Sequence, residues 1–180
     1  MQYRLDRDDR IEAVSTDWLD FARANGAPDL TAENVIGRPL WDFVAGADTR
    51  HLYELMFRRA RNDGVSFVVP FRCDAPTARR FMELVVHPAG RGGIDLEGRL
   101  VRGEKRDPAR LLDPAVPRTN DSLMICSWCK KVRPEQTWLD AEIAITSMDL
   151  FLTPRLPQLT HGICPVCSDR VLKEIDADVA

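Results

Sequence analysis

Three segments in the middle of the chain alternate apolar and polar positions, as half-buried β-strands do. They run from Val65 to Cys73, from Arg80 to His87 and from Ile94 to Val101. The interruptions between them, Asp74-Ala75-Pro76 and Gly90-Arg91-Gly92-Gly93, are short and consist mainly of turn-forming residues. Because short turns join neighbouring strands as hairpins, the pattern predicts an antiparallel sheet.

Apolar positions recur at helical spacing in two segments before these strands. The first begins near Thr16 and stops at Asn25-Gly26, and the second runs from about Asp48 to Asn62-Asp63-Gly64. Glycine ends helices because it adopts the left-handed backbone conformation without steric cost. A short strand from Arg10 to Val14 is expected before the first helix. Both helices are expected to cover the apolar face of the sheet.

The composition changes after about residue 103, which divides the chain into two expected units. Residues 104–121 are mostly polar and contain Pro108, Pro114 and Pro117, although Leu111-Leu112 is expected to dock on the first unit. The predicted fold class is α+β. It comprises an antiparallel sheet with flanking helices over residues 1–103, a linker over 104–121 and a small metal-binding module over 122–180.

The bulk composition, with 44% hydrophobic and 29% charged residues, is typical of a soluble globular protein. No apolar run reaches the roughly 18–20 residues that span a bilayer, and the first residues are charged rather than apolar. The sequence therefore predicts a cytoplasmic protein without membrane contact. Its net charge of -3 argues against a nucleic-acid partner, because nucleic-acid binders carry a basic surplus.

Four of the five cysteines form two pairs with two residues inside each pair. Cys126 and Cys129 make the first pair, and Cys164 and Cys167 make the second. A two-residue gap lets a tight turn direct both sulfurs at one ion, and four thiolates around one ion form a closed structural zinc site. The sequence therefore predicts zinc held by all four cysteines. The side chains expected to form a small core around it are Trp138, Leu139, Ile143 and Ile145.

Other interpretations of the cysteine pairs stay open at this point. An iron–sulfur cluster uses the same number of ligands, and the four side chains could simply be buried. A redox-active dithiol would need one pair on a strand–turn–helix unit, and no strand is expected before either pair. His161 could replace one cysteine or orient the site without binding the ion. A closing helix over residues 165–176 is expected to begin at Pro165.

Two parts of the chain resemble known bacterial signalling families. Residues 1–103 resemble a PAS sensory domain, in which an antiparallel sheet and short helices enclose a small cavity. The likeness is carried by residues from Ile11 to Trp18, Val35 to Phe43, Phe71 to Asp74 and Arg79 to Leu84. Residues 124–167 resemble a cysteine-rich tail that follows sensory or receiver domains. That likeness is carried by Cys126-Ser127-Trp128-Cys129-Lys130-Lys131-Val132, Trp138, Glu142 and His161-Gly162-Ile163-Cys164-Pro165-Val166-Cys167.

Further residues are candidates for a role in the PAS-like part. His51 is a candidate haem ligand or a surface histidine, and His87 is expected to be structural. Cys73 is a candidate redox thiol beside Arg72, Arg79 and Arg80, or a half-buried strand end. The side chains that would line a ligand cavity, or else fill the core, are Phe57, Phe67, Phe71, Met82 and Leu84.

The resemblance implies a stand-alone signal-transduction sensor or adaptor. Its PAS-like part would sense a small molecule or a partner, and it would act by contact with a signalling protein and as a homodimer. No enzyme is expected, because the sequence shows no nucleophile–base pair and a four-cysteine ion has no open position. Two alternatives remain: a redox or metal sensor that uses the zinc thiolates, and a zinc-dependent nucleic-acid-binding regulator that uses Lys130, Lys131 and Arg133.

Overall fold

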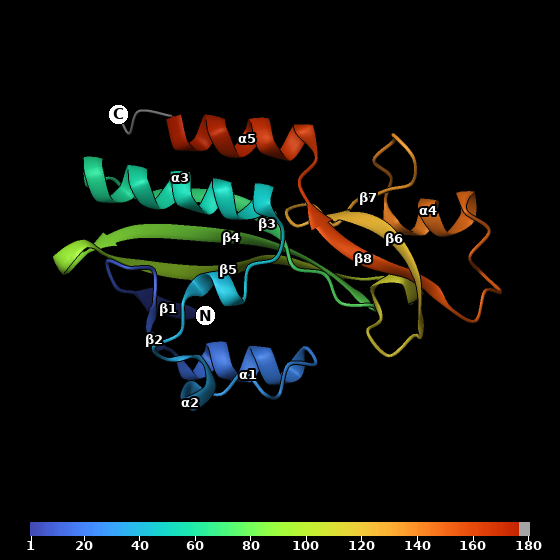
Figure 1. Ribbon diagram of the computed structural model, residues 1–180, viewed down its shortest axis with the longest axis horizontal. Helices are drawn as coiled ribbons and strands as arrows, with labels where there is room; N and C mark the ends of the chain where they lie inside the picture. The colour runs from blue at the N-terminus through green and yellow to red at the C-terminus, as the bar shows by residue number, and fades with distance from the viewer. Residues whose placement is uncertain (177–180) are drawn as a thin grey trace.

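The computed structural model describes residues 1–176 and has an α+β fold with two sheets (Figure 1). The larger sheet has five antiparallel strands in the order β2-β1-β5-β4-β3. Its strands are β1 (Gln2–Leu5), β2 (Ile11–Val14), β3 (Phe67–Arg72), β4 (Ala78–Ala89) and β5 (Gly93–Lys105). The predicted antiparallel sheet is therefore confirmed, and the three predicted central strands correspond to β3, β4 and β5.

The helices of the first half begin and end at the residues that favour such boundaries. They are α1 (Thr16–Ala24), α2 (Ala32–Val35), the 3₁₀ turn η1 (Leu40–Asp42) and α3 (Ala47–Asp63). The Ser15 side chain accepts a hydrogen bond from the backbone N–H of Trp18 and so caps α1. Gly64 ends α3 with a φ of 68°, the left-handed conformation that glycine adopts readily.

A second, three-stranded sheet follows in the order β7-β6-β8. Its strands are β6 (Arg118–Cys126), β7 (Val132–Arg133) and β8 (Leu156–Gly162). The remaining elements are the 3₁₀ turns η2 (Gly90–Gly92) and η3 (Arg110–Leu112) and the helices α4 (Ala141–Ser147) and α5 (Pro165–Asp176). The closing helix begins at Pro165, as the sequence predicted, and reaches Asp176, the last residue that the structure describes. β6 and β8 pair in parallel, whereas β6 and β7 are antiparallel.

The last helix lies against the first half of the chain. Figure 1 shows α5 alongside α3, on the same side of the large sheet. Val171 and Ile175 of α5 belong to the same buried cluster as Met56 and Phe57 of α3 and Val69 of β3. The hydrophobic core of the large sheet therefore extends into the C-terminal part of the chain.

A second buried cluster lies between α4 and the small sheet. It contains Leu123, Ile125, Val132 and Ile145, with Leu139 packed against it. Leu111 of η3 also belongs to it, so the linker docks through this leucine on the small sheet. The expected small core around the metal is therefore distributed differently: Leu139 and Ile145 are in this cluster, whereas the side chain of Ile143 is 54% exposed.

A group of charges, of which Asp74 and Arg106 are buried and Arg79 and Glu142 are partly exposed, joins α4 to the large sheet. The carboxylate of Asp74, 1% exposed, accepts hydrogen bonds from Arg72 and, at 2.9 Å, from Nη1 of Arg106. Arg106 also pairs with Glu142 of α4, whose Oε1 accepts a hydrogen bond from Arg79 Nη2 at 2.7 Å. Because charges that are removed from water need partners, these contacts fix α4 against the β3–β4 turn.

In the part of the chain that the structure covers, no helix has both the length and the apolar composition that crossing a lipid bilayer requires.

Candidate metal centre

The parallel pairing of β6 and β8 brings the two cysteine pairs together. Cys126 is the last residue of β6 and lies in register with Gly162, the last residue of β8. Because the two strands are parallel, the segments that follow them leave the sheet at the same end. The backbone N–H of Ser127 donates to the carbonyl of Gly162 at 2.9 Å and holds the two exits side by side.

The four sulfurs of Cys126, Cys129, Cys164 and Cys167 lie within 4.8 Å of one another. The Sγ atoms of Cys129 and Cys164 are 3.8 Å apart, and no disulfide joins any of the cysteines. Three of the four side chains are buried, and Cys129 is half-buried. Four thiol groups at this spacing can hold one metal ion.

Each pair sits in a turn that directs both of its sulfurs inwards. In the first pair, Cys126 exchanges backbone hydrogen bonds with Lys130 and Lys131, and Lys130 adopts a φ of 63°. In the second pair, the backbone N–H of Cys167 donates to the carbonyl of Cys164 at 3.0 Å as α5 begins. Proline suits the first helical position, where Pro165 lies, because no backbone N–H is needed there.

Hydrogen bonds favour the ionised form of one sulfur in particular. Contacts from the thiols of Cys129 and Cys167 lower the pKa of Cys126, against the opposing effect of burial. The backbone N–H of Cys164 adds a hydrogen bond of 3.4 Å to the same sulfur. The hydrogen bond that Cys129 makes with Cys126 raises the pKa of Cys129 to about 12, and burial and the charge on Cys126 act in the same direction. A cation placed among the sulfurs removes this mutual repulsion, which is how a metal allows all four to ionise.

The sequence predicted no strand before either pair, and this prediction was wrong. β8 leads directly into the second pair, which opens α5. The strand was missed because Leu156-Pro157-Gln158-Leu159-Thr160-His161-Gly162 contains a proline and few β-branched residues. The strand–turn–helix unit alone would suit a dithiol, but here both pairs meet in one cluster of four sulfurs.

The first pair is also bound to the edge of the large sheet. The backbone N–H of Arg72, the last residue of β3, donates to the carbonyl of Trp128 at 2.7 Å. The Trp128 side chain is 4% exposed and packs 5.7 Å from the ring of Tyr53 on α3. Cys126, Cys164 and Cys167 accordingly belong to the buried cluster of the large sheet.

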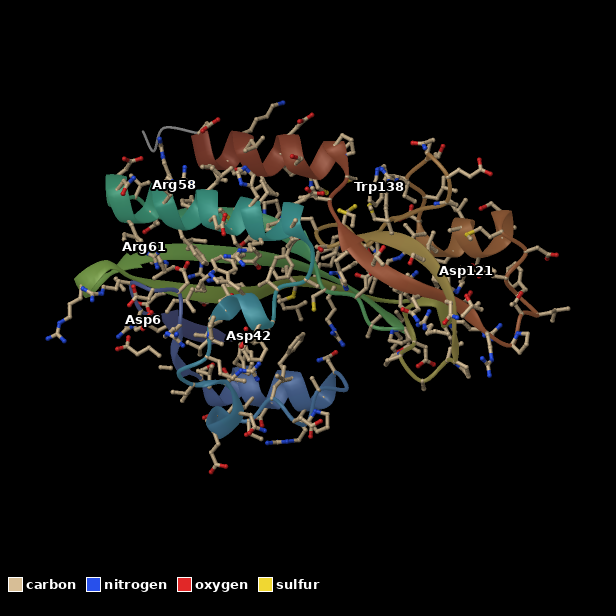
Figure 2. The ribbon with its side chains drawn as sticks, viewed as in Figure 1. Asp6, Asp42, Arg58, Arg61, Asp121 and Trp138 are labelled. Carbon is tan, nitrogen blue, oxygen red and sulfur yellow. The ribbon has the colours of Figure 1, made fainter. Side chains whose placement is uncertain are left out.

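Trp138, in the segment between β7 and α4, packs against the same cluster. Figure 2 shows its side chain between the start of α5 and the segment that carries β7. The guanidinium of Arg133 lies 5.6 Å from the centre of its ring. Trp138 is thus the member of the expected metal core that the structure places beside the cysteine site.

His161 lies outside the group of four sulfurs and contacts the first turn instead. Its Nδ1 is 3.4 Å from Oγ of Ser127, which accepts a 2.8 Å hydrogen bond from the Thr49 hydroxyl. Burial and the charge of Lys130 lower the pKa of His161. The backbone approaches α3 so closely that a Cβ on Gly46 would lie 2.6 Å from the carbonyl oxygen of His161. Sequence reasoning missed Thr49 and Gly46, because this contact joins distant segments.

The other candidates from the sequence lie apart from the four sulfurs. His51 is exposed, and Nδ1 of His87 contacts the Ser66 hydroxyl at 2.7 Å. Cys73 is a half-buried free thiol at the end of β3. Phe57 and the other proposed cavity residues, Phe67, Met82 and Leu84, are buried, whereas Phe71 is partly exposed.

A cavity of about 280 Å³ opens next to the first cysteine pair. Its walls come from the start of α3, the end of β3 and the turn that holds Ser127 and Lys130. Nζ of Lys130 donates to the carbonyl of Ser127 at 2.7 Å. Burial lowers the pKa of this amine, with the charges of Cys73 and Asp74 acting in the opposite direction.

Comparison of the chain with protein-family models, with curated proteins and with solved structures finds no match. The likeness of residues 1–103 to PAS domains, and of residues 124–167 to a cysteine-rich signalling tail, therefore stays an expectation from sequence motifs. What is established is an α+β fold and a cluster of four cysteines that can hold a metal ion.

Proposed function

We propose that the four cysteines hold one zinc ion with a structural role. Zinc–sulfur bonds of about 2.3 Å in a tetrahedron place neighbouring sulfurs about 3.8 Å apart. The distance between the sulfurs of Cys129 and Cys164 agrees with that geometry. The ion would neutralise part of the thiolate charge and hold both turns, and four protein ligands leave no position for a substrate.

We propose that the whole chain is a sensory or adaptor protein of bacterial signalling, acting through protein–protein contact. The observation that carries this proposal is the shared core: the cysteine site, α5 and α3 are parts of one buried cluster with the large sheet. A change in the PAS-like part, caused by a ligand or a partner, would reach the metal turn through Tyr53 and Trp128.

Exposed apolar side chains near the small sheet support a role in protein contact. Leu152 is 95% exposed and Phe151 is 59% exposed, in the loop between α4 and β8. Val166, between the cysteines of the second pair, is 66% exposed. Neighbouring apolar side chains in water are typical of surfaces that bind a partner. We propose this loop as the contact surface for a signalling partner.

The experiment is affinity capture from native cells with zinc-loaded protein, compared with the variant Leu152→Asp. The expected result is a reproducible signalling partner that the wild type retains and the variant loses. Zinc content and thermal stability of the variant serve as controls for folding. Capture of the same proteins by both forms refutes this surface. Capture of no signalling protein, together with turnover of a substrate by the purified protein, refutes the adaptor role.

A redox-sensing function is the second candidate, favoured by the half-buried position of Cys129. Its sulfur lies 3.8 Å from that of Cys164. Peroxide would take two electrons from this pair, giving one disulfide and two water molecules after two protons are taken up, and the ion would be released. Zinc that stays bound at peroxide levels that oxidise an exposed thiol refutes this alternative.

A further inference from the structure

In the cavity beside the first cysteine pair, the amine of Lys130 has N–H bonds left for a ligand, whereas the Thr49 hydroxyl donates to Ser127 and the Ser127 hydroxyl contacts His161. The cavity is lined by the hydroxyls of Thr49 and Ser127, the amine of Lys130 and the ring of His161. Lys130 uses one of its three N–H bonds on the carbonyl of Ser127, which leaves two for a ligand. A molecule that binds this amine must supply acceptors.

The start of α3 adds to the same character. Ala45 and Thr49 line the cavity, and Gly46, the residue before α3, makes no side-chain cap. The first backbone N–H groups of a helix have no partner within the helix and carry partial positive charge. The carboxylate of Asp48 in the first turn of α3 offsets part of this positive charge, so Lys130 is the main positive charge at the cavity.

The charges around the cavity favour an anion over a cation. Lys130 and Arg72 are both lining residues, and no aspartate or glutamate is among them. Arg72 is paired with Asp74, so Lys130 supplies the free positive charge. The four cysteines of the metal centre do not line the cavity, so their thiolates are not part of the wall that a ligand would contact.

The remaining wall is aromatic. Phe43, Tyr53, Phe71 and Trp128 line it, from four different segments of the chain. Pockets for drug-sized ligands hold roughly 300–1,000 Å³, so this cavity suits a smaller molecule with one ring.

We propose that this cavity binds a small carboxylic acid with an aromatic or similarly apolar body. Lys130 and the start of α3 would bind the carboxylate, and the four aromatic side chains would enclose the body. The inference deepens the sensory role proposed above, and rests on it for its biological meaning, by naming a class of signal. A bound acid would touch Trp128 and Ser127 and would stabilise the first cysteine turn in one arrangement.

The test uses the full, zinc-loaded chain with its tryptophans labelled with ¹⁵N. The chain has four tryptophans, so four indole signals are expected, and Trp128→Phe assigns the one of interest. Phenylacetate is titrated into the protein, and so, in a separate experiment, is phenylacetamide, which has the same shape without the charge. We expect a saturable shift of the Trp128 signal with phenylacetate and binding of the amide weaker by at least about tenfold.

Two lysine variants locate the charge. Lys130→Met should weaken phenylacetate binding by at least about tenfold, and Lys131→Met, one position along and outside the cavity lining, should leave it unchanged. Zinc content and thermal stability show that both variants are folded. Absence of saturable binding, equal binding of acid and amide, or equal effects of the two variants overturns the inference. Failure of binding with zinc content and partner capture intact leaves the proposed adaptor role standing.

Discussion

The indole ring of Trp128 lies 5.7 Å from the phenol ring of Tyr53, at an angle of 57° between the planes. The ring centre of Tyr53 lies 5.8 Å from that of Phe57, and the ring centre of Phe57 lies 6.0 Å from that of Trp41. Burial of this row is deep enough to raise the pKa of Tyr53 to about 12. The row runs from the first cysteine turn through α3 to η1, so the cysteine cluster and the first half of the chain share one packed contact.

The first prediction concerns Trp128 itself. Trp128→Ala should lower the free energy of unfolding by about 3–5 kcal/mol, because it leaves a cavity between α3 and the cysteine turn. Trp138→Ala, which removes the same side chain from a partly exposed position, should cost clearly less. Urea unfolding of the zinc-loaded proteins measures both. Equal losses for the two variants contradict the assigned role of Trp128.

The second prediction separates the four clustered cysteines from the fifth. Cys167→Ser should abolish stoichiometric zinc binding and lower the melting temperature, because three thiolates bind zinc less tightly and α5 loses its anchor. Cys73→Ser should keep one zinc per chain, since Cys73 is not among the four sulfurs. Elemental analysis and thermal unfolding give the answer. Zinc retained in full by Cys167→Ser contradicts the assigned ligand set.

The third prediction uses two glycines with similar backbones and different surroundings. Gly46 has a φ of 91° and Gly26 a φ of 81°, so alanine strains both positions, at about 1–2 kcal/mol each. Only at Gly46 would the new Cβ meet the carbonyl of His161, whereas nothing lies within 4 Å of Gly26. Gly46→Ala should therefore destabilise the protein more than Gly26→Ala in urea unfolding. Equal destabilisation would mean that α3 does not approach His161 this closely.

The fourth prediction is a pH dependence of the contact between α4 and the large sheet. Burial raises the pKa of Glu142, but hydrogen bonds from its own backbone and from Arg79, with the charge of Arg106, lower it on balance below 4.5. A carboxyl group with a lowered pKa in the folded state stabilises the protein above its unfolded pKa. That contribution is lost as the pH falls through the folded pKa.

Glu142→Gln should therefore be less stable than the wild type at pH 7, and the difference should shrink as the pH is lowered below about 4.3. Unfolding by urea at a series of pH values measures it. Glu54→Gln is the control, because Glu54 pairs with Arg50 on an exposed face of α3, where such pairs contribute little. A difference that stays constant from pH 7 to the acid range shows that folding does not shift the pKa of Glu142, which contradicts the stabilising contacts assigned to its carboxylate.

The helices and hairpins of the fold were predictable because their signals are local. Ser15 and Gly64 are boundary residues whose effect depends only on the adjacent turn. β1 was not predicted, since Gln2-Tyr3-Arg4-Leu5 alternates polar and apolar residues over only four positions, which is too short a run to indicate a strand alone. It is a strand because it lies between β2 and β5, and neither pairing can be inferred from its own residues.

The cysteine spacing predicted which side chains of the site meet, but not what surrounds them. Sulfur is the preferred ligand for a soft ion, so Cys126 and Cys164 could be recognised as candidate ligands from their residue type and their spacing. Trp128 and Thr49 do not, because an aromatic residue and a threonine occur in many environments. Their roles follow from the docking of α3 against the first turn, a contact between residues that lie 78 positions apart.

The parallel strands β6 and β8 set the order of events by which the metal centre can form. A parallel pair needs a long connection, and closing such a loop is slow compared with forming a hairpin or a helix. Before that closure, an ion could reach only the two sulfurs of one pair, either Cys126 and Cys129 or Cys164 and Cys167, because only the cysteines within a pair are close along the chain. An ion captured early would complete its coordination with water or with another chain. An ion bound by all four cysteines would therefore complete its coordination only after β6 and β8 have paired.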